Sequence, residues 1–183
     1  FVMHGEGSKP LFTLGAAYYA KDLAPLAEDG PPTQLAGNLS QLDGYVSGAP
    51  FNTPVGSASP GPILPGAKYT FSFRASPGEA LSFATMLAAT NDVFFGPAAG
   101  GIPLFGADDT PLSGDITDRI SLWDTGTEAN ERPGIGPNTV SNQAAPDTGS
   151  GGEGKVQLLE DVNDGFTYPA VDAVLKVTVT VGE

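Results

Sequence analysis

The sequence predicts an all-β chain: an antiparallel β-sandwich with one or two short helices in a crossover and long Gly/Pro-rich loops. The 183 residues include 25 Gly and 17 Pro, and these separate many short apolar runs. Frequent turns between short apolar runs are typical of all-β domains and not of helical bundles. Hydrophobic residues make up 40% of the chain, which is too many for wholesale disorder. The length suits a single domain over residues 1–183, and no internal repeat or domain boundary is visible.

The first half of the chain contains the helical candidates and the clearest strand signal. Apolar periodicity predicts helix between Ala16 and Leu42, where Gly30-Pro31-Pro32 separates two short helices and Thr33 is a candidate cap for the second. Residues 43–66 are dense in Gly, Pro, Ser and Asn, which predicts a surface loop. Lys68–Arg74 then alternates strictly, with aromatic residues on one face, and this predicts a strand.

Short strands and one long loop are expected in the second half. The apolar runs that predict strands are Ala80–Leu87, which we expect to run antiparallel to the preceding strand, then Val93–Phe95, Ile102–Phe105 and Ile116–Trp123. Residues 131–154 carry Gly and Pro but almost no large apolar residue. They predict a long loop that needs help to be ordered. Val171–Val181 alternates along its whole length and predicts a long closing strand.

The charge and composition exclude several kinds of function. The formal net charge is −13, and the 8 Lys and Arg residues cannot form a basic face for nucleic acid or for an anionic membrane. Acidity fits a protein outside the cell or one that binds divalent cations. No apolar run approaches the length of a transmembrane segment, and no cysteine is present to form a disulfide. The chain begins at Phe1, so we expect a mature, trimmed or partial sequence.

Two polar turns carry the candidate metal site. The first contains Asp124 and Glu128, four residues apart, with Gly126 between them to let the backbone fold back. The second contains Asn91 and Asp92 and also follows an apolar run. Ca²⁺ prefers several oxygen ligands that converge from a flexible loop. We therefore expect the two turns to meet at one end of the sandwich and to bind calcium. The candidate ligands are Asp92, Asp124, Glu128 and, through its amide oxygen, Asn91.

These residues also have an ordinary alternative. Aspartates in turns commonly accept hydrogen bonds from nearby backbone N–H groups without any ion. Carboxylates that are brought together need either a cation or a raised pKa, and this repulsion favours the calcium hypothesis. Solvated turns are the more common outcome for the acidic candidates Asp108, Asp109, Asp115 and Asp118. Asp161, Asn163 and Asp164 have a spacing similar to that of a calcium loop but lack the distal Glu of a helix-loop-helix calcium site.

An enzyme is not expected. His4 is the only histidine and lies near a terminus, so neither a histidine-dependent hydrolase nor a multi-histidine zinc site can be assembled readily. Paired carboxylates cleave glycosides only across a cleft, and nothing in the sequence places two of them there. Trp123 lies next to the candidate ion and is expected to pack in the core.

Several of these motifs together resemble the bacterial spondin amino-terminal domain, which also opens the animal matrix proteins F-spondin and mindin. The resemblance runs from about Leu11 to Val181 and rests on Leu81–Leu87, Thr90–Asp92, Leu122–Glu131 and Pro133–Asn138. The turn from Asp124 to Glu128 is its most specific part. The resemblance implies an antiparallel β-sandwich related to calcium-dependent lipid-binding domains. It also implies a calcium ion at one end, with Asp92, Asp124 and Glu128 as its acidic ligands.

The resemblance also implies a role and shows one departure. The animal domains are matrix and adhesion modules and the bacterial relatives are mostly secreted, so we expect a secreted calcium-binding module. Family members begin with an additional β-strand that pairs near the carboxyl-terminal one, and that strand is missing before Val2–Leu14. Val171–Val181 would then lie at an open sheet edge. Residues upstream or a partner chain would have to cover this edge.

Three functions therefore remain open. The first is the secreted calcium-binding module for extracellular adhesion or matrix. The second is a subunit of an extracellular filament or surface layer, assembled from copies of this chain by strand complementation. The third is a calcium-dependent glycan or lipid binder, which requires an open coordination position on the ion.

Overall fold

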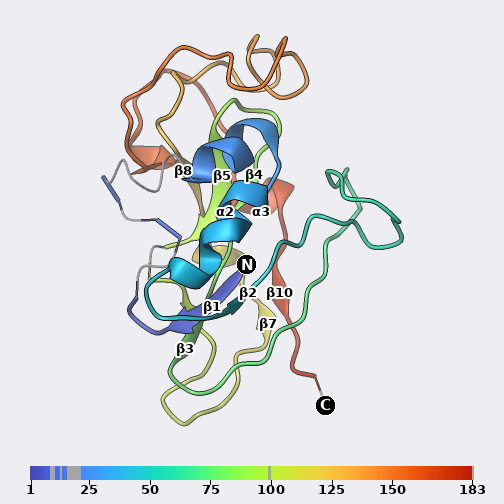
Figure 1. Ribbon diagram of the computed structural model, residues 1–183, viewed down its shortest axis with the longest axis vertical. Coiled ribbons are helices and arrows are strands. Elements are labelled where there is room, and N and C mark those ends of the chain that lie inside the picture. Colours follow the sequence, from blue (N-terminus) through green and yellow to red (C-terminus); the bar gives the residue numbers. More distant parts are fainter. Residues whose placement is uncertain (9–10, 13, 16–21, 99, 183) are drawn as a thin grey trace.

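Short antiparallel strands dominate the regular structure, accompanied by a few short helices (Figure 1). The computed structural model covers residues 1–183 and describes all of them except 9–10, 13, 16–21, 99 and 183. The predicted β-rich class is confirmed. Among the described residues, no helix has both the length and the apolar character needed to cross a bilayer.

The strands and helices are brief because Gly and Pro interrupt the chain so often. The strands are β1 (Val2–Gly5), β2 (Tyr45–Gly48), β3 (Glu79–Ser82), β4 (Thr85–Met86), β5 (Val93–Pro97), β6 (Ile102–Pro103), β7 (Gly114–Asp115), β8 (Ile120–Asp124), β9 (Gln157–Leu158) and β10 (Thr178–Val179). The helices are the π-helical η1 (Pro25–Asp29), the α-helices α2 (Thr33–Asn38) and α3 (Val171–Val174), and the 3₁₀ turns η2 (Leu39–Gln41), η3 (Thr117–Arg119) and η4 (Leu159–Asp161).

The strands form two four-stranded sheets and one separate pair. The first sheet has the order β2-β1-β3-β6, the second has the order β4-β5-β8-β9, and β10 pairs with β7. Every pairing is antiparallel. The longest register joins β5 to β8, from Val93 opposite Asp124 to Pro97 opposite Ile120. This register brings the start of β5 and the end of β8 to the same edge of the second sheet.

The chain passes from the first sheet to the second between β3 and β4. Only Phe83 and Ala84 separate the two strands, and they belong to different clusters of buried side chains. The strand predicted over Ala80–Leu87 is therefore divided into two short strands in different sheets. Its predicted pairing with the preceding strand is wrong, because β3 pairs with β1 and β6, and β4 pairs with β5.

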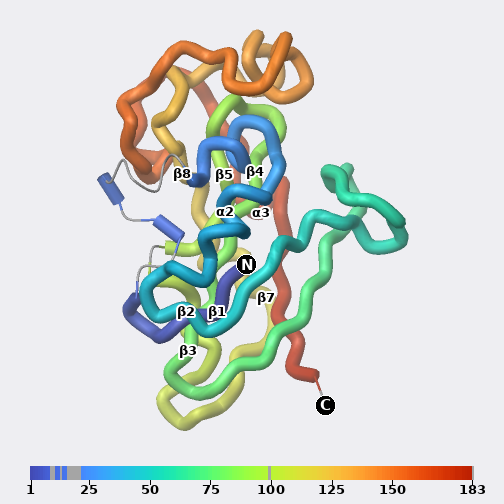
Figure 2. The backbone as a smooth tube through the Cα atoms, in the orientation of Figure 1, coloured from blue at the N-terminus to red at the C-terminus, as the bar shows by residue number. Residues whose placement is uncertain are grey.

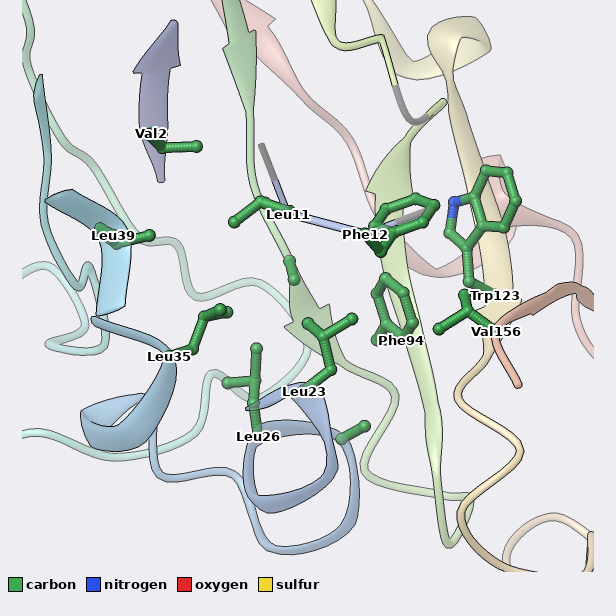
Figure 3. Close-up of a cluster of buried hydrophobic side chains, with 12 residues drawn as sticks. Val2, Leu11, Phe12, Leu23, Leu26, Leu35, Leu39, Phe94, Trp123 and Val156 are labelled. Atoms are coloured by element: carbon green, nitrogen blue, oxygen red, sulfur yellow. The ribbon is translucent and has the colours of Figure 1, made fainter. Parts of the chain in front are cut away.

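The first apolar cluster joins the helical segments to the second sheet. Figure 3 shows Leu23 between Leu26 and Phe94 of β5, and Phe12 next to both Phe94 and Trp123 of β8. The ring centroids of Phe12 and Phe94 are 5.5 Å apart in an edge-to-face arrangement. Leu23 and Leu26 are both buried.

The second cluster uses the opposite face of β5. Phe94 belongs to the first cluster, whereas its neighbours Val93 and Phe95 belong to the second, as the two-residue period of a strand requires. Trp123 is 3% exposed and its indole N–H donates to the Gly96 carbonyl at 2.9 Å. The prediction that Trp123 packs in the core is confirmed.

The helical segment departs from the prediction at its second cap. Gly30 ends η1 with a positive φ of 93°, so the break predicted at Gly30-Pro31-Pro32 is confirmed. Thr33 is the first residue of α2 and not its cap, a position held by Pro32 without a side-chain hydrogen bond. Residues 16–21, which the prediction included in the first helix, lie outside the described part of the chain.

Lys68–Arg74 is not a strand, and that prediction is wrong. The segment makes no ladder with a neighbour, although Tyr69, Phe71 and Phe73 are half-buried while the residues between them are exposed. Phe71 stacks on Phe1 with ring centroids 4.4 Å apart. The alternating pattern of Lys68–Arg74 therefore reflects an apolar face whose aromatic rings pack on other side chains. It does not reflect backbone pairing with another strand.

Val171–Val181 is not a long strand either. Its first residues form α3, and only Thr178 and Val179 pair, with Asp115 and Gly114 of β7. The half-buried Val177 and Val179 pack on the second cluster, so the alternating pattern is retained over a few residues only. Val171–Val181 was expected to form a long open sheet edge, but only a two-residue strand is present there. β1 itself lies inside the first sheet, between β2 and β3.

Two long loops extend beyond the sheets. Residues 52–68 project from the body of the protein, and residues 131–154 arch over the end of the second sheet (Figure 2). The loop predicted over 131–154 is confirmed, since no named strand or helix lies within that range. It folds back on the acidic turn: Ala129 N–H donates to Ser150 O at 2.7 Å, and Gly152 N–H donates to Thr127 O at 3.1 Å.

Candidate metal centre

The candidate centre lies at the edge where β5 begins and β8 ends. Asp92 directly precedes β5 and Asp124 is the last residue of β8. The antiparallel register places Asp124 opposite Val93, and Thr125 N–H donates to the Asp92 carbonyl at 3.2 Å. Two turns that are distant in the sequence thus meet where the sequence predicted.

Asp92 has one carboxylate oxygen that is hydrogen-bonded and one that is not. Its side chain is 0% exposed. Oδ2 accepts the Glu128 backbone N–H at 3.1 Å and the Thr125 hydroxyl at 3.3 Å. Oδ1 is buried and has no hydrogen-bond partner among the residues that the structure describes. A buried acceptor left in this way is unfavourable by about 1–3 kcal/mol unless a proton or a cation lies beside it.

Asp124 is held by the turn that follows it. Its Oδ1 accepts the Gly126 backbone N–H, and its Oδ2 accepts the Asn130 amide at 3.3 Å. Gly126 has a φ of 66°, and a Cβ at this position would collide with the Lys155 backbone carbonyl. Glycine is therefore required for the turn to fold back and to place Asp124 beside Asp92.

Both aspartates have raised pKa values. Burial, together with the nearby charge of Asp124, raises the pKa of Asp92 to about 8. Burial also raises the pKa of Asp124, and the backbone N–H of Gly126 opposes this shift. The two carboxyl groups lie within hydrogen-bonding distance of each other and are shielded from solvent. Two full negative charges are therefore unfavourable here without a counter-charge.

Asn130 links this pair to a third carboxylate. Its amide NH₂ donates to Asp124 Oδ2 at 3.3 Å and to Asp164 Oδ2 at 3.0 Å. Its own Oδ1 is buried and has no partner within the described part of the chain. Asp164 is further held by Tyr168, whose hydroxyl donates to Oδ2 at 2.7 Å. The sequence shows a calcium-like spacing at Asp161, Asn163 and Asp164, but this spacing did not place Asp164 beside Asp124.

The carboxylate of Glu128 points away from this pair. Its Oε2 accepts the Asn91 amide at 3.0 Å and its Oε1 accepts the Gly149 N–H at 2.8 Å. One carboxylate oxygen from each of Glu28, Glu128 and Asp147 lies within 4.8 Å of the other two. The structure therefore divides the predicted ligand set: Asp92 and Asp124 are together, and Glu128 belongs to a neighbouring acidic group.

Asn91 orients this second group. Its amide NH₂ donates to Glu128 and to the Ala129 carbonyl, while its Oδ1 accepts the Glu131 N–H at 3.2 Å. The amide oxygen that we expected to face an ion is thus occupied by the backbone. Glu28 is 5% exposed, and burial is the main cause that raises its pKa. Neither Glu28 nor Asp147 carried a sequence signal, since both lie outside the two turns.

His4 lies apart from both acidic groups, in the middle of the first sheet. It is 0% exposed, and its Nε2 lies 2.9 Å from Ser82 Oγ. Its Nδ1 lies 2.8 Å from Ser8 Oγ and 2.9 Å from the Gly5 carbonyl. Burial lowers the pKa of His4, although the Gly5 carbonyl opposes this shift. Both ring nitrogens are used within the sheet, as in an ordinary buried histidine.

Comparison of the chain with protein-family models, with curated proteins and with solved structures found no match. The spondin resemblance therefore rests on the sequence motifs alone. The chemical argument for the site depends neither on these comparisons nor on the resemblance, because it comes from the oxygen atoms around Asp92 and Asp124. What these residues offer is a set of hard oxygen donors, drawn from separate turns, without thiolate or imidazole ligands nearby.

Proposed function

We propose that this chain is a calcium-binding β-sandwich module that acts outside the cell in adhesion or in a matrix. Calcium would join the loops at one end of the sandwich. The observation that carries the proposal is the close approach of the buried carboxyl groups of Asp92 and Asp124, together with an Asp92 Oδ1 that has no hydrogen-bond partner among the described residues. Such an arrangement is unfavourable for the metal-free protein and becomes favourable when a divalent cation neutralises both charges.

The β-sandwich in this proposal comes from the sequence resemblance. Val2 and Met3 are neighbours on β1, yet Val2 belongs to the first cluster and Met3 to the second. The same division holds for Phe94 and Phe95 on β5 of the other sheet. Both faces of these two strands are therefore buried.

The donor chemistry favours calcium over a transition metal. Carboxylate, amide and backbone oxygens suit hard cations, whereas zinc sites use Cys and His. The chain contains no cysteine and one histidine, and that histidine is buried in the other sheet. An ion at this edge would order the loop over residues 131–154, which contacts the acidic turn and has few apolar residues of its own.

The extracellular role is supported by the acidic composition and by the sequence resemblance. A net charge of −13 keeps the chain soluble and disfavours anionic partners, while it attracts divalent cations. The filament alternative loses its main support, because the long closing strand that suggested it is a short helix and a two-residue strand.

Thermal denaturation with calcium and with a chelator tests the proposal. At a hundredfold excess of calcium over Kd, the free energy of unfolding should rise by roughly 2.7 kcal/mol. Asp124→Asn should remove most of this gain, whereas Asp43→Asn, which removes an exposed carboxylate elsewhere, should keep it. A melting temperature of the wild-type protein that is the same with calcium and with chelator would falsify the proposal. Binding to matrix proteins or glycans, with and without chelator, then tests the adhesive role.

A further inference from the structure

A series of side-chain hydrogen bonds ends at the carboxylate of Asp124. Asn130 donates its amide NH₂ to Asp124 Oδ2 at 3.3 Å and to Asp164 Oδ2 at 3.0 Å. The hydroxyl of Tyr168 donates to the same oxygen of Asp164 at 2.7 Å. Asp124 is the last residue of β8, whereas Asp164 and Tyr168 belong to the irregular segment after η4. These hydrogen bonds therefore connect the candidate centre with a segment that lies much later in the sequence.

The two carboxylates hold the amide of Asn130 in one orientation. An amide NH₂ offers two hydrogens, and here the acceptors are Asp124 and Asp164. Half a turn about the Cβ–Cγ bond would place the amide oxygen against both carboxylates, which have no hydrogen to donate when they are ionised. The amide keeps its orientation although its own Oδ1 is buried and has no hydrogen-bond partner among the described residues. The direction of the Asn130 amide is therefore set by its two acceptors.

Asp164 is itself fixed by two further hydrogen bonds. Its Oδ1 accepts the Phe166 N–H at 2.8 Å, and its Oδ2 accepts the Tyr168 hydroxyl. Tyr168 is half-buried and packs against the second apolar cluster. Asp164 is thus anchored to its own loop and, through Tyr168, to the core. A carboxylate held in this way is a stationary acceptor for Asn130, so the other hydrogen of the amide reaches Asp124 from a fixed direction.

The amide also lies between two carboxylates that repel each other. Burial is the main cause that raises the pKa of Asp124, and the charge of Asp164 adds to it. The Gly126 N–H holds Oδ1 of Asp124, and the Asn130 amide holds Oδ2. Without this amide, the charge of Asp164 would act on Asp124 with no donor between them. The carboxylate of Asp124 would then be free to turn away from its place beside Asp92.

We propose that Asn130 and Asp164 are positioning residues for the candidate calcium centre. Asp164 fixes the amide of Asn130, and this amide orients the carboxylate of Asp124. The oriented carboxylate then binds the ion together with Asp92, and neither positioning residue is itself a ligand. This inference rests on the proposed function, since it concerns the same centre. Hydrogen-bonded groups behind a metal ligand typically change the metal affinity by about 10–100-fold.

The test is calcium titration by calorimetry, combined with terbium luminescence, on the full chain. Asn130→Ala and Asp164→Ala should each weaken calcium binding by about tenfold or more. Because both residues act through Asp124, the double variant should bind about as weakly as the weaker of the two single variants, whereas independent effects would multiply. Asp161→Ala is the matched control, because it removes an exposed carboxylate from the same region, and it should bind as the wild type does.

Terbium supplies a readout that a general loss of stability would not change. Its emission lifetimes in H₂O and in D₂O give the number of water molecules on the bound ion. A displaced Asp124 carboxylate leaves its coordination position to water, so terbium bound to Asn130→Ala or to Asp164→Ala should carry more water than in the wild type. Wild-type calcium affinity in both variants, or weaker binding with unchanged hydration, would overturn the inference and leave the proposed function standing. If the wild-type chain binds neither ion, both are wrong.

Discussion

Replacing Asp92 by Asn removes one of the two titrating groups of the buried pair and keeps the shape of the side chain. Without calcium, burial and the charge of Asp124 raise the pKa of Asp92 to about 8, compared with 3.8 for a free side chain. Between these two values the folded protein retains a proton that the unfolded chain has released. The free energy of unfolding of the wild type therefore falls as the pH rises through this window. Asp92→Asn carries no such proton and lacks this dependence.

The size of the effect follows from the width of the window. Each pH unit inside it changes the free energy of unfolding by about 1.4 kcal/mol. From pH 5 to pH 7 the wild type should lose roughly 3 kcal/mol relative to Asp92→Asn. In a chain of 183 residues, each kcal/mol moves Tm by about 2–4 °C. The difference in Tm between the two proteins should therefore change by roughly 6–12 °C.

Circular dichroism melts in chelator at pH 5, 6 and 7 measure this difference, with Asp43→Asn as the control for loss of an exposed charge. Added calcium should remove the pH dependence of the wild type, because the ion takes the place of the proton, and should leave Asp92→Asn unchanged. Parallel behaviour of the wild type and Asp92→Asn across this range in chelator would show that the two carboxyl groups do not share a buried site.

Three further predictions concern the scaffold. Burial lowers the pKa of His4 below its ordinary 6.5, so the folded protein favours the neutral ring. In thermal melts with calcium, the wild type should therefore lose stability relative to His4→Gln as the pH falls below about 6.5. Gly126→Ala should lower the free energy of unfolding by more than about 1 kcal/mol in urea titrations, and a neutral result would contradict the tight turn. Trp123→Phe loses the hydrogen bond to Gly96 and should be less stable by about 1–3 kcal/mol in the same titrations, and equal midpoints would argue against that bond.

Local pattern in the sequence predicts which side chains face inward better than it predicts strand partners. Phe71 and Phe73 are half-buried on the predicted face, and so are Val177 and Val179, yet neither segment forms the predicted long strand. Alternation is a property of neighbouring residues. A ladder requires a partner from elsewhere in the chain with free N–H and C=O groups, and a short pattern carries no information about that partner.

The same distinction applies to the candidate centre. Asp92 and Asp124 could be predicted as neighbours, because each lies at the end of a strong apolar run and antiparallel strands bring such ends together. Glu28 and Asp147 could not, and the calcium-like spacing at Asp164 did not indicate which turns it would join. The three residues are reached through a π-helical turn, a long loop and an irregular segment, whose paths depend on the packing of the whole chain. Spacing alone placed Glu128 with Asp124, whereas its carboxylate lies with those of Glu28 and Asp147.

The acidic end of the molecule has a consequence for how the chain folds. Its groups come from residues as far apart as Glu28 and Asp164, so these contacts close very long stretches of chain. Contacts of this kind form late, because the entropy of ordering the intervening chain must be overcome first. An ion that needs the finished arrangement would be absent from the transition state. It would slow the rate of unfolding while leaving the rate of folding nearly unchanged.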